Sequence, residues 1–90
     1  MMITLIEIFN SKIRINVLLT LESHPDIKVR EISRKIGARY TITREIQSLE
    51  EHGLLEIDKD SSHYRIRLTQ KGINFLKIYR NTLKKLEKLS

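Results

Sequence analysis

The hydrophobic pattern of the chain changes its period at Gly53. Over residues 40–52 the apolar side chains recur every three or four positions, which is the spacing of one face of an α-helix. Over residues 63–68 they alternate with polar side chains, which is the spacing of a half-buried strand. The two patterns in this order predict a mixed fold, mostly α with a small β-hairpin (α+β).

One proline, Pro25, and three glycines divide the chain further. Asn10 or Ser11 is the expected N-cap of the second helix. Gly37 is expected to end the third helix in the left-handed conformation, whereas Lys28, at the start of that helix, lacks the hydroxyl of a capping box. The predicted elements are helices over residues 2–9, 11–22, 29–36 and 40–52, strands over 54–58 and 63–68, and a last helix over 70–89.

This order of elements predicts a winged helix-turn-helix, because two short helices flank a glycine-containing turn and a hairpin follows the second of them. Residues 1–90 are expected to form a single domain, since two domains from 90 residues would each be too small to hold a core without staples. The chain has no cysteine, which excludes disulfides and thiolate metal sites. No stretch approaches the ~20 apolar residues of a membrane span, and the N-terminal segment, which carries Glu7, is interpreted as structure rather than as a signal peptide.

The formal net charge of +6 is concentrated in two segments. Residues 1–23 are neutral, whereas residues 28–44 and residues 70–90 each hold six bases and one acid. A basic chain favours polyanionic partners such as DNA, RNA or an anionic membrane surface. The charge therefore indicates a class of partner, and the position of each basic segment in the fold has to identify which one.

Three segments resemble known regulators. Residues 40–55, Tyr-Thr-Ile-Thr-Arg-Glu-Ile-Gln-Ser-Leu-Glu-Glu-His-Gly-Leu-Leu, resemble the recognition helix and wing entry of MarR-type regulators. Residues 11–19 resemble the arginine-containing helix of ArsR-type regulators. Residues 64–76 resemble small archaeal winged-helix proteins, in which a Leu-Thr-x-x-Gly step leads from the wing into a dimerising helix. The resemblance implies a winged-helix DNA-binding regulator. The cysteines and His/Asp clusters of metal-sensing relatives are absent, so no metal and no cofactor are expected.

The helix over residues 40–52 carries the residues expected to read DNA bases. At ~100° per residue its apolar stripe leaves arginine, glutamine, threonine and tyrosine on the opposite side. Arginine pairs with guanine, glutamine pairs with adenine, and threonine contacts the thymine methyl group. The N-terminal half of such a helix enters the major groove. The candidates for base contact are Tyr40, Thr41, Thr43, Arg44 and Gln47.

Two further sets are expected to contact the DNA backbone. The first helix of a helix-turn-helix crosses the phosphate backbone, so its cations neutralise phosphate charge rather than read the base sequence. The second set lies in the wing, where the acidic residues Asp58 and Asp60 at the hairpin tip argue against deep insertion into the minor groove. The phosphate candidates are Lys28, Arg30, Arg34, Arg39 and Ser48, and the wing candidates are Lys59, Ser61, Ser62, His63 and Arg65.

The last helix carries an apolar seam typical of a helix that packs against another helix. The expected dimerisation residues are Leu76, Tyr79, Leu83 and Leu86. Phe75 and Ile78 are expected to pack on the domain's own core, and the second half of the helix is expected to meet a partner chain. Residues 1–22 are predicted to share this interface with residues 70–89, because residues 11–22 are apolar on almost every side. The lysines of the last helix are expected to face solvent, with a phosphate contact as the alternative.

The sequence thus predicts a homodimeric, sequence-specific regulator of transcription that binds double-stranded DNA. The helix over residues 40–52 would lie in the major groove and the wing over residues 54–68 on the flanking backbone or minor groove, with half-sites about one helical turn (~34 Å) apart. The alternatives are an architectural DNA-binding protein and a winged helix that binds protein. An enzyme and a membrane-bound protein are not expected. The expected location is the cytoplasm, in association with the nucleoid; a small-molecule effector is left open.

Overall fold

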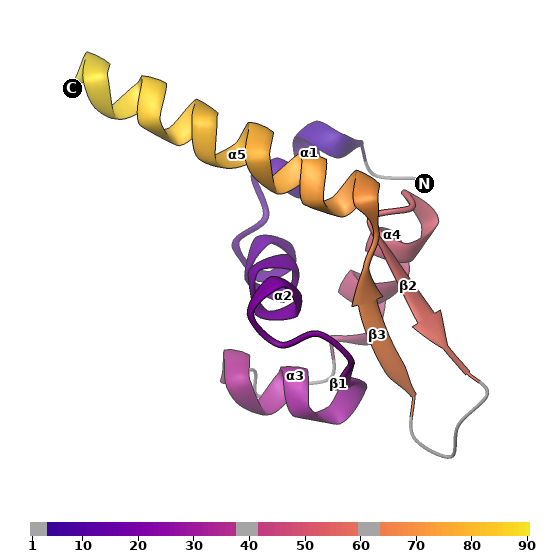
Figure 1. Ribbon diagram of the computed structural model, residues 1–90. Helices are drawn as coiled ribbons and strands as arrows, with labels where there is room; N and C mark the ends of the chain where they lie inside the picture. The colour runs from indigo at the N-terminus through magenta and orange to yellow at the C-terminus, as the bar shows by residue number, and fades with distance from the viewer. Residues whose placement is uncertain (1–3, 38–41, 60–63) are drawn as a thin grey trace.

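The computed structural model describes residues 4–37, 42–59 and 64–90. Five helices and three short strands follow one another in an order that confirms the predicted class, mostly helical with a small antiparallel sheet (Figure 1). In chain order they are α1 (Leu5–Phe9), α2 (Lys12–Ser23), β1 (Ile27–Lys28), α3 (Val29–Ile36), α4 (Thr43–Glu51), β2 (Leu55–Asp58), β3 (Arg65–Leu68) and α5 (Gln70–Leu89).

Helix α2 lies at the centre of the molecule and is covered by its own chain. It contacts α1, α3, α4, β3 and α5, and Val17 and Leu18 are completely buried. The apolar pattern of this helix on almost every side is therefore explained by burial within one chain. The apolar pattern of residues 11–22 therefore does not by itself require a partner chain, and a share of residues 1–22 in a dimer interface stays a prediction.

The first three helices begin and end at residues with clear local causes. Thr4 and Ser11 are the N-caps of α1 and α2, and each hydroxyl accepts a bond from a backbone N–H in the first turn. The predicted first helix therefore begins at Leu5 rather than at residue 2. Helix α3 has the predicted bounds; Lys28 makes no side-chain cap, and Gly37 ends the helix with φ +77°, as expected.

Helix α4 begins later than predicted and ends as predicted. Its first helical residue is Thr43, because Ile42 at the N-cap has non-helical angles and buries its side chain. At the other end the N–H of Gly53 bonds the Glu50 carbonyl, and the N–H of Leu54 bonds the Leu49 carbonyl. These two hydrogen bonds, with Gly53 at φ +72°, form a Schellman motif that ends the helix and directs the chain into the wing.

The sheet has one strand more than the sequence predicted. Its order is β1-β3-β2, with β3 antiparallel to both neighbours. Strand β1 has only two residues, and the next N–H, that of Val29, bonds the Tyr64 carbonyl over 3.1 Å. The base of the wing is thus hydrogen-bonded to the start of α3. Tyr64 was expected on the apolar face of the second strand, but it precedes β3 and is 54% exposed.

Helix α5 starts against the wing and extends past the rest of the molecule (Figure 1). Thr69 is its N-cap: its hydroxyl accepts a bond from the Gly72 N–H and donates one to the Gly53 carbonyl. The helix then packs Leu76 into the core formed by α2, α4 and the sheet. None of the described helices is long and apolar enough to cross a membrane.

Candidate nucleic-acid interface

Helix α4 presents a polar face that matches the predicted base-reading set. Thr43, Arg44 and Gln47 are exposed, whereas Ile46 and Leu49 on the other side are buried. The three exposed residues supply donors, acceptors and a methyl group of the kind that pair with base edges. The described part of α4 therefore has the side chains needed for direct readout.

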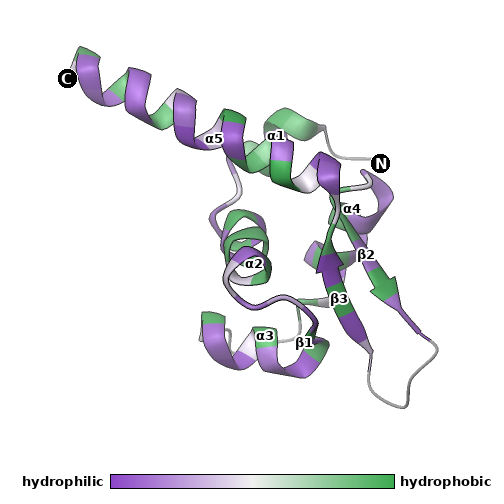
Figure 2. Ribbon diagram, viewed as in Figure 1, coloured by the Kyte–Doolittle hydropathy of each residue, from purple (hydrophilic) through white to green (hydrophobic). Residues whose placement is uncertain are grey.

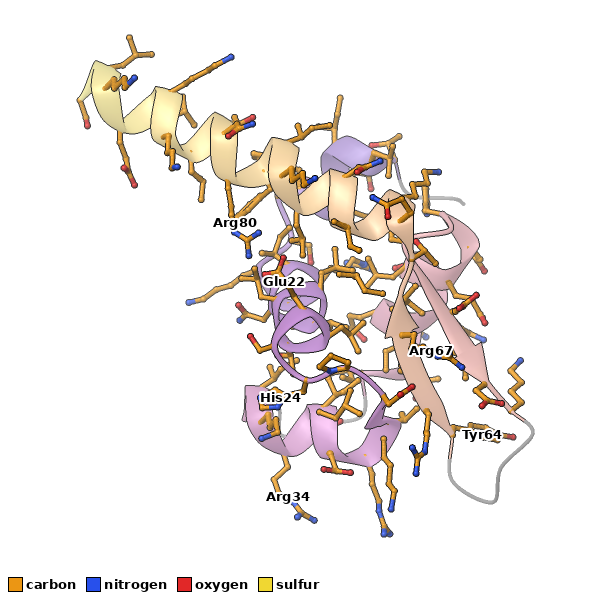
Figure 3. All side chains as sticks on the ribbon, viewed as in Figure 1. Glu22, His24, Arg34, Tyr64, Arg67 and Arg80 are labelled. Atoms are coloured by element: carbon orange, nitrogen blue, oxygen red, sulfur yellow. The ribbon has the colours of Figure 1, made fainter. Side chains whose placement is uncertain are left out.

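Helix α3, which precedes α4 in the chain, carries exposed positive charge. Its apolar side is anchored by the fully buried Ile32, and this leaves Arg30 and Arg34 exposed. Arg34 projects away from the body of the molecule at the end of the fold where the wing also lies (Figure 3). Lys28, which precedes the helix, is half-buried. All three predicted phosphate candidates on and beside this helix thus carry accessible surface.

The sheet brings a second cation beside Lys28. In the β1–β3 register Lys28 lies opposite Arg65, and the neighbouring pair, Ile27 and Ile66, is buried. Because opposite residues of an antiparallel pair share a face, Lys28 and Arg65 both lie on the outer side. Asp58 faces Arg65 from the other neighbouring strand. Lys28, Arg65 and Asp58 thus form a row of mixed charge across the three strands at this edge of the wing.

Arg67 differs from Arg65 although both lie on the outer face of β3. Its Nε lies 3.3 Å from the carboxylate of Asp26, in the turn between α2 and β1, and Glu56 faces it from β2 (Figure 3). Asp26 has a positive φ of 61°, an unusual angle for a residue other than glycine. Arg67 is thus paired within the protein, and Arg65 is the stronger wing candidate. The pairing of Arg67 with Asp26 was not predicted from the sequence, since only the register of β1 and β3 brings the two residues together.

Ser48, a predicted phosphate candidate, already has partners within the protein. Its hydroxyl accepts a bond from Arg14 Nε at 2.7 Å and donates one to the Glu45 carbonyl at 2.9 Å. A serine hydroxyl has a single hydrogen to donate. A bond to a phosphate oxygen would therefore require the bond to Glu45 to break, which weakens the case for this residue.

The four predicted dimerisation residues of α5 differ in whether their own chain covers them. Leu76 is completely buried in the core of its own chain, and Tyr79 packs on Phe9 of α1 with ring centroids 5.0 Å apart. Leu83 and Leu86 are 37% and 54% exposed, whereas Ile78, expected in the core, is 62% exposed. Leu76 is therefore unavailable to a partner chain in this structure. Ile78 lies on the exposed apolar side, so its predicted place in the core is wrong. The prediction failed because a wide apolar stripe on a helix does not reveal which of its two edges the rest of the chain covers.

One ion pair connects α5 to the centre of the fold. Arg80 Nη1 donates to Glu22 Oε2 at 3.0 Å, and Arg80 Nη2 bonds the other carboxylate oxygen (Figure 3). The hydrogen bonds from this guanidinium hold the pKa of the Glu22 carboxyl below its ordinary value, against a smaller opposing effect of burial. The same bonds raise the pKa of Arg80. This bidentate pair links the middle of α5 to the C-terminal end of α2.

Several predicted residues lie outside the described part of the chain: Arg39, Tyr40 and Thr41 before α4, and Ser61, Ser62 and His63 in the wing. Lys59, the remaining wing candidate, is exposed at the end of β2. Within residues 4–37, 42–59 and 64–90, no group of three or more His, Cys, Asp or Glu side chains is placed to hold a metal ion.

Comparison with known proteins identifies the fold. MarR superposes with a TM-score of 0.79 at 24% identity, over 93% of this chain and 65% of the MarR chain. The PcaV transcriptional regulator from Streptomyces coelicolor gives 0.76 at 22% identity, over 88% of this chain and 59% of its own. MepR from S. aureus, solved as a complex with DNA, gives 0.76 at 19% identity, over 94% and 74%. No protein-family model and no curated relative matches the sequence.

These likenesses show that the chain has the winged helix-turn-helix fold of MarR-type structures. The chain spans less than two thirds of the length of MarR and PcaV. At such low identity the similarity describes architecture, so function has to be argued from the side chains on the surface.

Proposed function

We propose that this chain, built on the winged helix-turn-helix fold, is a sequence-specific regulator of transcription that binds double-stranded DNA as a homodimer. The main support for this proposal is the exposed polar face of α4. Thr43, Arg44 and Gln47 point outward there, and the apolar residues of the helix are turned into the core. An α-helix fits the major groove, where arginine and glutamine distinguish guanine and adenine.

The cations on α3 and at the wing support the same function. Arg30 and Arg34 on α3 are exposed, and the wing adds the exposed Arg65 opposite the half-buried Lys28; the hydrogen bond between Val29 and Tyr64 joins the two groups. Cations in these positions contact phosphates and fix the register of the recognition helix on the duplex. In this proposal they supply affinity and salt dependence, and α4 supplies specificity.

The exposed apolar side chains support a homodimer. Ile78, Leu86 and Leu89 on α5 are more than half exposed, as is Ile6 on α1. Figure 2 shows the hydrophobic residues of α1 beside α5 and further hydrophobic positions along the part of α5 that extends past the body. An apolar surface formed by two neighbouring helices suits a two-fold contact with a second copy. Two recognition helices would then read half-sites about one helical turn apart.

The two other functions make different demands on the surface. A winged helix that binds protein through α4 would expose apolar side chains there, but Ile46 and Leu49 are only 4% and 0% exposed. An architectural DNA-binding protein would use the same cations with little base preference, so the ratio of specific to non-specific affinity separates it from a regulator.

The test is selection of the purified protein's binding sites from random-sequence duplex DNA at two salt concentrations. The proposal predicts enrichment of a palindromic consensus at both salt concentrations. Arg44→Ala and Gln47→Ala should each lose the consensus while keeping salt-sensitive binding to any duplex, because the phosphate contacts remain.

Lys77→Ala is the matched control, since it removes an exposed cation from α5, away from the recognition helix. This variant should select the wild-type consensus. Tight binding without a consensus, collapsing at the higher salt, would identify an architectural protein. No binding at either salt would overturn the proposal and indicate a protein partner.

A further inference from the structure

Arg14 on α2 reaches across to the recognition helix. Its Nε donates to the Ser48 hydroxyl at 2.7 Å, between residues 34 positions apart in the sequence. Its Nη1 also donates to the Ser11 hydroxyl at 3.2 Å, and Ser11 is the N-cap of the same helix. The guanidinium is thus held at one end by the start of α2 and bonds α4 with the other.

Within the part of the chain that the structure describes, the side chains that anchor α4 in the core are apolar. Ile42 at its N-cap makes no side-chain bond to the helix, and its anchors Ile46 and Leu49 are apolar. Apolar burial fixes how deeply a helix packs but is non-directional. The bond from Arg14 to Ser48 has a defined direction, and Ser48 passes the restraint to the helix backbone through its own bond to the Glu45 carbonyl.

We infer that Arg14 is a positioning residue that sets the rotation of α4, and thereby the aim of Arg44 and Gln47, through its hydrogen bond to Ser48. Gln47 is the immediate neighbour of Ser48, so a change in the rotation of one moves the other. A side-chain tip about 6 Å from the helix axis moves by about 1 Å for each 10° of rotation. Hydrogen-bonded distances to a base edge span only about 0.5 Å, so such a movement breaks a bidentate pair.

This inference rests on the proposed function, but it makes a separate statement about the free protein. Arg14→Lys keeps the positive charge, yet its single ammonium cannot bond Ser11 and Ser48 with two separate nitrogens. Ser48→Ala removes the acceptor and places a good helix former in α4, so melting of the helix is not the expected cause of any effect. Lys12→Ala, which removes an exposed cation from the same turn of α2, is the matched control.

The first measurement is amide hydrogen exchange in the free protein. Arg14→Lys, Ser48→Ala and the double variant should each speed exchange in α4 about tenfold, with α5 unchanged, and Lys12→Ala should match the wild type. The double variant should be no worse than the more affected single one, since both substitutions act on the same Arg14–Ser48 bond. Unchanged exchange in α4 of folded variants would overturn the inference, whatever the DNA result.

The second measurement is the ratio of affinities for the selected duplex and a scrambled one. The ratio should fall about tenfold in Arg14→Lys and Ser48→Ala, while the salt dependence of binding to the scrambled duplex stays at the wild-type value. An unchanged ratio, with the salt slope reduced by about 1 in Arg14→Ala, would show that Arg14 contacts a phosphate directly and would overturn the positioning role. A wild-type ratio near one would refute the proposed function, and the exchange data would still decide the role of Arg14.

Discussion

Gly72 explains, at the scale of a single residue, why a Leu-Thr-x-x-Gly step joins the wing to α5. A Cβ at this position would overlap the Leu54 carbonyl oxygen and lie 2.8 Å from Leu68 Cδ1. That carbonyl also accepts the Thr69 N–H, so the backbone just before β2 cannot move away without losing a bond. Glycine is required here because the helix begins in direct contact with the wing.

Gly72→Ala should therefore destabilise the fold, against the usual preference of helices for alanine. We expect a loss of about 2–3 kcal/mol in the free energy of unfolding, typical of overpacking against a part of the structure that cannot yield. Asn81→Ala, at an exposed position of the same helix, should have no effect or stabilise slightly. Urea unfolding of both variants checks this, and equal stabilities would contradict the close packing seen at Gly72.

Local signals in the sequence predicted the residues whose role is set by their neighbours in the chain. Gly37 in the left-handed conformation and Ser11 as an N-cap depend only on adjacent backbone, and both predictions are confirmed. The predictions failed for residues whose burial depends on an element far away in the sequence. Leu76 and Ile78 both belong to the apolar side of α5, and only the packing of α2 against that helix shows which is covered.

At the scale of elements, the same limit explains the missed strand and the late start of α4. Strand β1 has two residues, too few for a periodic pattern, and exists because Ile27 and Lys28 pair with β3. Ile42 fits the helical stripe of α4 but lies just before the helix, since apolar burial rather than a polar cap defines this end. The face that carries Arg44 and Gln47 was nevertheless predictable from periodicity alone.

The two arginines of β3 are expected to act differently although they are two residues apart. Arg65→Ala should weaken DNA binding uniformly across sequences and lower the salt slope by about 1, because it removes a phosphate contact. Arg67→Ala should leave that slope unchanged and reduce stability by less than about 1 kcal/mol, because it breaks an exposed pair with Asp26. Binding titrations over a range of salt, with urea unfolding, test both; a larger change of slope for Arg67→Ala would reverse the assignment.

The ion pair between α5 and α2 predicts a pH dependence of stability. Arg80 lowers the pKa of Glu22 from an ordinary value of 4.5, so the pair's contribution is fully present above pH 4.5 and is lost as the pH falls through the lowered pKa. The stability advantage of the wild type over Glu22→Gln should be constant at neutral pH and shrink below pH 4.5. Unfolding measured from pH 7 to pH 3 checks this, with Glu87→Gln as the control. An advantage independent of pH would mean that the pair contributes nothing measurable.

At the scale of the whole molecule, the exposed apolar side of α5 predicts which substitution would disrupt the proposed homodimer. Leu86→Glu should convert the protein to a folded monomer, because it places a charge in the apolar contact without entering the core. Lys84→Glu is the matched control: it lies two residues earlier, about 200° around the helix, and should remain dimeric. Sedimentation of both variants measures this. A Leu86→Glu protein that stays dimeric would move the interface elsewhere.

In the proposed function, DNA is bound by the exposed side chains of α4, α3 and the outer face of the wing. The most direct test is to follow the backbone amide signals of the isotope-labelled protein by NMR while a selected duplex is added. The largest changes should fall on Thr43, Arg44 and Gln47, with smaller ones at Arg34 and Arg65, and the lysine-bearing outer side of α5 should stay unchanged. Changes confined to α5 and α1, with α4 unaffected, would contradict the proposed function.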